Sequence, residues 1–382
     1  MEYRKKIPCS IIRGGTSKGL YFLEEDIPKA GSERDEFLLQ VMGSPDKKQI
    51  NGLGGGASVT SKVAIIKRSK KRGVDVEYTF AQVSVDKPLV SYKGNCGNIS
   101  AGVGPFAIEK GLVEAVSPIT EVKILNTNTN KLIVEEVLVE NGQVQYQGKC
   151  KIAGVPGSGA PIKMKFWQPS GTLGKGLLPT GNVVDHLDVP GIGLVEVSII
   201  DAANPLVFVN AKDLGLNGTE LPAELDAQKE KLVLLETVRG MAAQKLNLIS
   251  DYRRSAWDSP GIPKMTLVSL AQKYQTTGGM KISENEIDLM GRMMSMQKTH
   301  PAYAMTGAMC TVAAAAVKGS VVNKVLNLKR DLHILKIGHP SGILEAEIEY
   351  EENGLIPNII FTAGFRTANL LMEGWVVLEK SY

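Results

Sequence analysis

The sequence has few of the residues that build metal centres, disulfide frameworks or nucleic-acid surfaces. Its 382 residues include four cysteines without a CxxC pair and four scattered histidines. Zinc sites and disulfide-rich folds depend on close ligand spacing, so we predict neither. Aromatic residues make up 5% of the chain, and the 44 basic and 40 acidic residues nearly cancel. This composition offers little for stacking or holding a nucleic acid, and no such partner is expected.

Long apolar runs are missing as well. No stretch approaches the ~20 apolar residues that a membrane-spanning helix needs, and the N-terminus is too polar for a signal peptide. We therefore expect no membrane contact and a cytoplasmic location, where thiols stay reduced. Apolar residues still make up 43% of the chain and charged residues 22%, which is typical of a globular protein.

The length of the chain predicts two domains. Each half has many strand-like segments and one helix rich in small residues, over 98–110 in the first half and 309–317 in the second. Such a helix fits inside a strongly curved sheet because small side chains leave room for the strands. We predict an internal duplication, with one domain over residues 1–184 and another over 185–382, whose last strand can cross back to the first domain.

Hydrophobic periodicity predicts an α+β protein with more strands than helices. Residues 62–67 and 74–80 form a hairpin around a basic turn, and 225–248 form one long helix. The capping box Ser283–Glu286 predicts a helix that continues through Ile287. Residues 52–57 have the spacing of a dinucleotide fingerprint, but a strand follows them where a helix is required. No cofactor motif remains, and we expect no cofactor.

The turn Gly94-Asn95-Cys96-Gly97-Asn98 is the most informative stretch of the chain. If a helix begins there, its free N–H groups and dipole stabilise a carboxylate and make a thiol more acidic. Cys96 is therefore a candidate catalytic thiol, and Asn95, Gly97 and Asn98 are candidate substrate contacts. The alternative for Cys96 is an inert buried thiol.

Other glycine-rich loops carry polar groups, and such loops let backbone amides approach a carboxylate closely. Ser17 is either a substrate contact or a turn former, and His300 bonds either the substrate or the backbone. Arg366 either clamps a carboxylate or forms an ion pair on a strand. The candidate substrate contacts from these loops are Thr16, Ser17, His300, Thr306 and Gly307.

Lys62 is the candidate base. Its immediate neighbours carry no charge, and on a strand it shares a face with Ala64 and Ile66. Burial there favours the neutral amine, which can accept a proton. The alternative is a strand-end lysine whose ammonium reaches solvent.

The chain resembles the family of 2-methylaconitate cis–trans isomerases and related allylic isomerases, which includes 3-methylitaconate Δ-isomerases. The stretches that carry this resemblance cover almost the whole chain: 12–19, 52–62, 94–98, 154–162, 178–181, 201–205 and 365–368. It implies a diaminopimelate-epimerase-like α+β fold of two pseudo-symmetric domains, each a curved sheet around a central helix, with the active site between them. Epimerases of that fold use one cysteine from each half. The second helix entry here, Thr306-Gly307-Ala308, has no thiol, so Lys62 becomes the expected base.

The resemblance also implies a reaction. Neutral Lys62 removes a proton beside a carboxylate, the charge spreads over a neighbouring C=C bond, and the ammonium or Cys96 returns a proton at the far carbon. The expected partner is a small unsaturated di- or tricarboxylate. Many relatives carry a second arginine where Asn369 follows Arg366-Thr367-Ala368, which favours a dicarboxylate and the conversion of methylitaconate to dimethylmaleate.

Several alternatives stay open at this point. They are isomerisation of 2-methylaconitate, tautomerisation of oxalomesaconate and, in a different class, a non-catalytic binder of small carboxylates. A homo-oligomer is expected.

Overall fold

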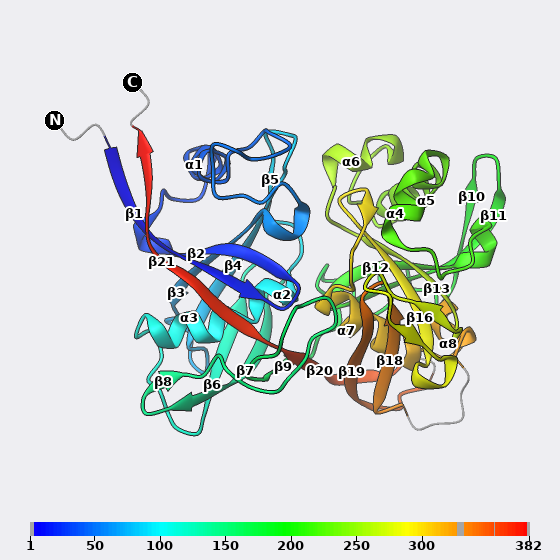
Figure 1. Cartoon of the computed structure of the whole chain (residues 1–382). Helices are drawn as coiled ribbons and strands as arrows, with labels where there is room; N and C mark the ends of the chain where they lie inside the picture. Colours follow the sequence, from blue (N-terminus) through cyan, green and yellow to red (C-terminus); the bar gives the residue numbers. More distant parts are fainter. Residues whose placement is uncertain (1–3, 327–331, 355, 380–382) are drawn as a thin grey trace. The chain divides into compact units, whose positions relative to one another are not determined.

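The computed structural model describes residues 4–326, 332–354 and 356–379 (Figure 1). The chain forms two compact units: unit 1 comprises Met1–Met164 and Phe365–Tyr382, and unit 2 comprises Lys165–Gly364. The boundaries of these units differ from those of the two domains predicted from the sequence, residues 1–184 and 185–382. That domain division stays a prediction.

Unit 1 is built on a mixed sheet whose strands pair in the order β21–β1–β2–β3–β4–β6–β7–β9. From β1 to β7 the neighbouring strands are antiparallel, parallel, antiparallel, parallel and antiparallel in turn. The strands are β1 (Arg4–Gly14), β2 (Ser17–Leu23), β3 (Lys62–Arg68), β4 (Val76–Val83), β5 (Val90–Ser91), β6 (Ile119–Asn126), β7 (Lys131–Glu140), β8 (Gln143–Val144), β9 (Ile162–Trp167) and β21 (Ala368–Glu379).

Unit 2 repeats the same sequence of pairings. Its strands follow the order β10–β11–β12–β13–β16–β18–β19–β20, and from β11 to β19 they alternate as in unit 1. This agreement confirms the predicted pseudo-symmetric α+β fold. The strands are β10 (Asp185–Val189), β11 (Gly193–Ala202), β12 (Asn204–Asn210), β13 (Lys264–Leu270), β14 (Tyr274–Gln275), β15 (Lys281–Ile282), β16 (Leu289–Ser295), β17 (Lys298–Thr299), β18 (Ile334–His339), β19 (Gly342–Glu351) and β20 (Asn358–Arg366).

Each sheet carries helices on both faces. In unit 1, α1 (Ser32–Met42) connects the parallel pair β2 and β3, whereas α2 (Gly97–Ser100) and α3 (Val103–Glu109) connect β4 and β6. Figure 1 shows α1 and α3 on different sides of the strands. Along β2, Phe22 packs on Phe37 of α1, and the neighbouring Tyr21 packs on Phe106 of α3. The two-residue period of a strand thus decides which side chains face the central helix.

The helices of unit 2 occupy the corresponding places. α4 (Pro222–Ala227) and α5 (Lys229–Lys245) connect β12 and β13, and α7 (Met305–Ala316) lies between β17 and β18 along the chain. Two short helices, α6 (Ser255–Asp258) and α8 (Val321–Lys324), complete the unit. Every residue of α7 is buried, because its run of alanines lets the strands approach closely.

Three helix predictions need correction. The long helix predicted over 225–248 is divided at Gln228 into α4 and α5. The first central helix is also divided: the break lies at Ala101 and Gly102, and Pro105 is in the first turn of the second piece. The capping box at Ser283 is present but closes a single 3₁₀ turn, Glu284–Glu286, because the next residues enter the buried strand β16.

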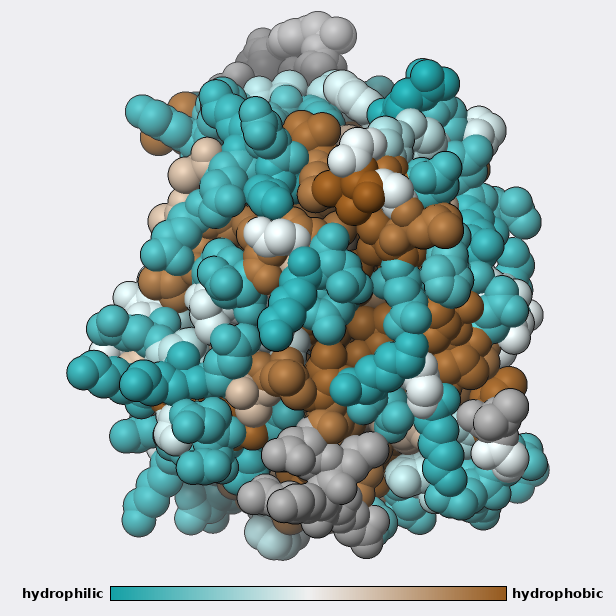
Figure 2. Space-filling view, turned by 90° about the vertical axis from the view of Figure 1, so that its right-hand side faces the viewer, coloured by the Kyte–Doolittle hydropathy of each residue, from teal (hydrophilic) through white to brown (hydrophobic). Residues whose placement is uncertain are grey.

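The surface carries some apolar side chains. Figure 2 shows hydrophobic side chains lying between polar ones on the face that it draws. Exposed examples in unit 2 are Leu194 at 75% and Trp257 at 59%. Among the described residues, no helix combines the length and the apolar character that crossing a membrane requires.

Replacing Gly14 by alanine tests how β1 is fitted to α2. A Cβ atom at Gly14 would overlap the main-chain carbonyl oxygen of Asn98, and main chain cannot move aside as a side chain can. We expect Gly14→Ala to lower the free energy of unfolding by about 3 kcal/mol, measured by urea denaturation. The control is Gly278→Ala, where the nearest atom lies 4.0 Å from the new Cβ. Equal stability of the two variants would show that Gly14 does not lie so close to the carbonyl oxygen of Asn98.

Candidate active site

Lys62 is buried on the side of the unit 1 sheet that faces the central helix. It is the first residue of β3, where Val63 and Ile65 pack into the core cluster that includes Phe37 and Leu38 of α1. Alternation along the strand turns Lys62, Ala64 and Ile66 to the other side. Only 6% of Lys62 is exposed, as its strand position predicted, so the alternative of a solvent-reaching ammonium is excluded.

The amine of Lys62 is held by neutral groups. Its Nζ donates a hydrogen bond to Oε1 of Gln82, the residue opposite it on β4. The ring of Phe80 lies 5.3 Å from Nζ. Within the described part of the chain, no carboxylate forms an ion pair with Lys62. Burial lowers the pKa of Lys62, and the charge of nearby Cys96 partly opposes this by raising it.

Gln82 also fixes the backbone that leads into β3. Its Nε2 donates to the carbonyl oxygens of Ser61, at 2.9 Å, and Ser58, at 3.1 Å. Gln82 could not be identified from the sequence, because an amide within a strand belongs to no recognisable motif. Only the register of β3 against β4 reveals that it lies opposite Lys62.

Cys96 lies at the N-terminal end of α2, in extended backbone, and its thiol is free and partly exposed. It is near enough to Lys62 and Arg366 for its charge to raise the pKa of each. The helix that it precedes has only four residues, so the positive dipole end predicted for this helix is weak. Any strong stabilisation of an anion at Cys96 must come from another group.

Arg366 supplies a buried cation beside this turn. Its Nε donates to Oδ1 of Asn98 at 2.9 Å, and Nδ2 of Asn98 donates to Oγ1 of Thr16 at 3.0 Å. Arg366 is 3% exposed, and no carboxylate pairs with it among the residues that the structure describes. Burial lowers its pKa to about 10, so it remains protonated at neutral pH. A buried cation without a counter-ion favours the binding of an anion.

The other predicted contacts of unit 1 differ in their surroundings. Asn95 is buried, and its Oδ1 accepts hydrogen bonds from Ser100 Oγ and Asn126 Nδ2, so it supports the turn from within. Gly97 begins α2 and is buried. Ser17 is 3% exposed, and its hydroxyl has no hydrogen-bond partner in the described residues. Thr16, Ser17, Lys62, Cys96 and Asn98 are therefore all placed in unit 1 around the entry of α2.

Unit 2 holds the remaining predicted contacts at or near the N-terminus of α7. Nδ1 of His300 accepts a hydrogen bond from the Ala302 amide at 3.0 Å, which orients its ring. The hydroxyl of Thr306 is buried without a partner in the described residues. At Gly307, a Cβ atom would overlap the terminal methyl group of Met293, so the methionine side chain packs against this glycine.

Asn204 is a further polar residue of unit 2 that the sequence analysis did not select. It is 1% exposed, and neither its amide nitrogen nor its amide oxygen has a partner in the described part of the chain. It begins β12, directly after Ala203, whose φ of 59° is unusual for alanine. Asn204 lies in the 201–205 segment, one of the stretches that carry the family resemblance. That resemblance was the signal in the sequence that could have identified it.

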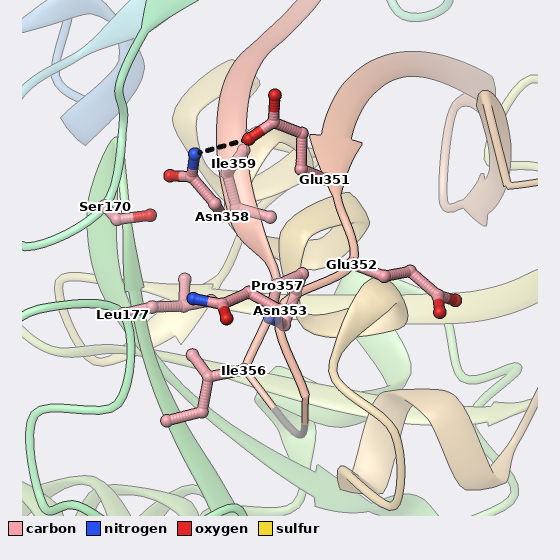
Figure 3. A pocket seen from close by; sticks show the side chains of 9 residues that line it. All are labelled: Ser170, Leu177, Glu351, Glu352, Asn353, Ile356, Pro357, Asn358 and Ile359. Atoms are coloured by element: carbon pink, nitrogen blue, oxygen red, sulfur yellow. Dashed lines mark hydrogen bonds between the residues drawn. The ribbon is translucent and has the colours of Figure 1, made fainter.

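A pocket elsewhere in unit 2 contains none of the predicted site residues. It has a volume of about 820 Å³, and Nδ2 of Asn358 donates to Glu351 at 3.2 Å beside it (Figure 3). Its lining residues are Ser170, Leu177, Glu351, Glu352, Asn353, Ile356, Pro357, Asn358 and Ile359. No group of three or more His, Cys, Asp or Glu residues with metal-binding geometry occurs in the described residues.

Comparison with known proteins gives full-length matches. A model of the PrpF protein family matches residues 4–379. The 3-methylitaconate isomerase of Eubacterium barkeri is 43% identical and aligns with 100% of this chain and 99% of its own length. The 4-oxalomesaconate tautomerase of Pseudomonas putida is 40% identical, and the 2-methyl-aconitate isomerase of Shewanella oneidensis is 38% identical. Each of these two alignments covers 98% of this chain and 97% of the relative.

Solved structures agree with these matches. The crystal structure of a methylitaconate-delta-isomerase superposes with a TM-score of 0.79 at 42% identity, covering 99% of this chain and 97% of that one. A hydroxyproline epimerase from Agrobacterium vitis, at 12% identity, has a TM-score of 0.61 over 99% and 93% of the two chains, which shows the fold alone. The chain is therefore an isomerase with an epimerase-like α+β fold. It belongs to the PrpF protein family.

The titration of Lys62 tests the environment of its amine. We expect NMR of isotopically labelled lysine to give Lys62 a pKa below the ordinary 10.5, because burial disfavours the ammonium. Gln82→Leu should lower it further, since the ammonium then loses its hydrogen-bond acceptor. Gln143→Leu, at an exposed residue of β8, is the control and should leave it unchanged. A Lys62 pKa at or above 10.5 would contradict the buried, unpaired amine.

Proposed function

We propose that this isomerase moves a C=C bond in a small unsaturated dicarboxylate by a 1,3-proton shift, without a cofactor, and that it converts methylitaconate to dimethylmaleate. One observation carries the proposal. Within unit 1, a buried lysine amine without a carboxylate partner, a free thiol and a buried arginine without a counter-ion lie around one turn. The names of the full-length relatives support the same class of reaction.

Lys62 acts as the base in this mechanism. Its depressed pKa leaves more of the neutral amine near neutral pH than an ordinary lysine has, and the neutral amine takes a proton from the carbon beside a carboxylate. The electron pair of that C–H bond forms a new C=C bond, while the old C=C pair moves to the terminal methylene carbon. The Lys62 ammonium or the Cys96 thiol then gives a proton to that carbon. Atoms and charge balance because one proton leaves and one returns.

Arg366 and Asn98 stabilise the charge that develops on the substrate. A carbon acid beside a carboxylate is weak, so the carboxylate must be neutralised as the proton leaves. The Arg366 guanidinium is held in place by Asn98 at 2.9 Å, and it has further N–H groups for a substrate oxygen. Because α2 is short, this cation does the work that the sequence analysis assigned to a helix dipole.

The dicarboxylate preference rests on Asn369 and on the relatives. Asn369 lies on β21 opposite Arg13 of β1. Arg13 already donates to the carbonyl and hydroxyl oxygens of Thr367. The Nη1 group of Arg13 is thus engaged by Thr367. The relatives named for 2-methylaconitate and 4-oxalomesaconate keep the tricarboxylate alternatives open. We also propose a cytoplasmic location, which keeps Cys96 a free thiol, and a homo-oligomer.

Solvent deuterium distinguishes an isomerase from a carboxylate binder. We expect NMR in heavy water to show methylitaconate converting to dimethylmaleate with deuterium in the new methyl group, because the Lys62 amine exchanges its protons with solvent. Lys62→Ala should reduce conversion by at least about 1,000-fold with a circular dichroism spectrum like that of the wild type. Lys71→Ala, at an exposed residue of the basic turn, is the matched control. Substrate that stays unlabelled and unchanged with the wild-type protein would favour the binder.

Removing the buried cation tests the proposed carboxylate contact. Arg366→Gln should raise the KM for methylitaconate by about 10- to 100-fold, the usual range for a lost charge-assisted hydrogen bond. Arg366→Lys should restore little of this affinity, because an ammonium cannot both bond Asn98 and present the planar fork of a guanidinium. Arg72→Gln, on an exposed turn, is the control. A normal KM in Arg366→Gln would remove Arg366 from the substrate site.

A further inference from the structure

Glu135 is a buried carboxyl group that the proposed mechanism does not use. It lies in β7 and is 0% exposed. Its Oε2 accepts a hydrogen bond from the main-chain N–H of Gly104 at 2.9 Å, and its Oε1 has no partner in the described residues. No lysine or arginine of the described chain pairs with it. A carboxyl in this setting is far cheaper to bury neutral than charged.

Glu135 bonds the backbone where the central helix of unit 1 is broken. In a continuous α-helix the Gly104 N–H would donate to the carbonyl four residues earlier, at Ser100, and Pro105 has no N–H to donate. Here the Gly104 N–H turns to Glu135 instead. A Cβ atom at Gly104 would lie 2.6 Å from Oε2, so only glycine leaves room for the carboxyl.

Tyr21 holds the other side of the same break. Its hydroxyl donates to the carbonyl oxygen of Ile99 in α2 at 2.5 Å, and a Cβ atom at Gly102 would overlap that hydroxyl. The spacing Gly102-Val103-Gly104 therefore matches two buried side chains, one from β2 and one from β7. From the sequence alone, these small residues are explained only by the limited space inside a curved sheet.

We propose that Glu135, as a neutral carboxyl, and Tyr21 are positioning residues. Together they clamp the break between α2 and α3 and thereby set the position of Cys96 at the start of α2. Ionisation of Glu135 would leave a buried charge with one unpartnered oxygen, and this destabilises the fold around the clamp even though the bond from the Gly104 N–H persists. The catalytic role of Cys96 rests on the function proposed above. The structural role of Glu135 and Tyr21 is independent of that function.

The groups around Glu135 do not offer it a cation. Tyr21 and Tyr78 face it from β2 and β4, and both are fully buried, so burial raises the pKa of each well above its usual range. Val122 is its partner on β6, where the flanking Glu121 and Lys123 pair with each other at the surface. Four more groups occur on the neighbouring elements: Glu109 and Lys110 at the end of α3, Tyr146 after β8, and Cys96. The lysines of β9, Lys163 and Lys165, are only partly buried, unlike their neighbours Ile162 and Met164.

Burial makes the stability that Glu135 contributes depend on pH. It raises the pKa of Glu135 from 4.5 to about 8, against a smaller lowering by the Gly104 N–H. The folded state then holds a proton that the unfolded state has released. The stability linked to Glu135 is fully present below pH 4.5 and is lost as the pH rises toward about 8.

Three variants of the full-length protein test the proposal. Glu135→Gln keeps the acceptor for Gly104 but cannot ionise, Glu135→Leu removes the acceptor, and Glu140→Gln is a control at the exposed end of the same strand. The readouts are the thermal midpoint from pH 5 to 9, the rate of Cys96 alkylation by iodoacetamide followed by mass spectrometry, and kcat and KM with methylitaconate. The first two need no substrate, so they stand even if the proposed reaction fails.

We expect the thermal midpoint of the wild type and of Glu140→Gln to fall between pH 5 and 9, with that of Glu135→Gln falling clearly less. Glu135→Leu should change the Cys96 alkylation rate at least fivefold and lower kcat more than it raises KM, and Glu135→Gln should restore both. Tyr21→Phe should shift alkylation in the same direction as Glu135→Leu. If Glu135→Gln shows the pH dependence of the wild type, or if Cys96 reacts at the wild-type rate in Glu135→Leu, the proposal is wrong. If Glu135→Leu does not fold, the pH comparison with Glu135→Gln decides alone.

Discussion

The account depends on one constraint, the burial of the Lys62 amine among neutral groups. A carboxylate partner would stabilise the ammonium, raise the pKa of Lys62 and remove its use as a base. The structure surrounds Nζ instead with the Gln82 amide and the Phe80 ring, so burial dominates and the pKa falls. The Arg366 cation lies in the same unit and interacts with Cys96. The Lys62 amine, as a base, and the Arg366 guanidinium, as an anion contact, can thus lie in one unit without a carboxylate that would neutralise either.

The two units share one topology but differ in how their central helices begin. Both units have the same order of strand pairings, and each places a helix between the second pair of parallel strands. In unit 2 the helix is continuous and rich in alanine, whereas in unit 1 it is interrupted after one turn at Ala101 and Gly102. The interruption weakens the dipole at Cys96, and the buried Arg366 provides a stronger source of positive charge.

Much of the fold was predictable because strand periodicity and turn signals are local. The hairpin of β3 and β4, the helix α1, the small-residue helix α7 and the burial of Lys62 follow from such patterns. Helix breaks were harder, since a stripe of apolar residues continues through Gln228 and a capping box precedes a strand at Leu289. The Gln82 contact was not predictable at all, because it depends on strand register, which a single sequence does not reveal. The same holds for Glu135, whose partner Gly104 lies 31 residues away.

Chemical rescue of Lys62→Ala tests the central claim most directly. The account predicts that methylamine or ethylamine, which can occupy the space left by the lysine, restores the conversion of methylitaconate. The restored rate should follow the concentration of the free amine and so rise with pH. A variant that binds methylitaconate normally but gains no activity from any small amine, or one whose rescue follows the ammonium concentration, would show that an uncharged amine at this position is not the base.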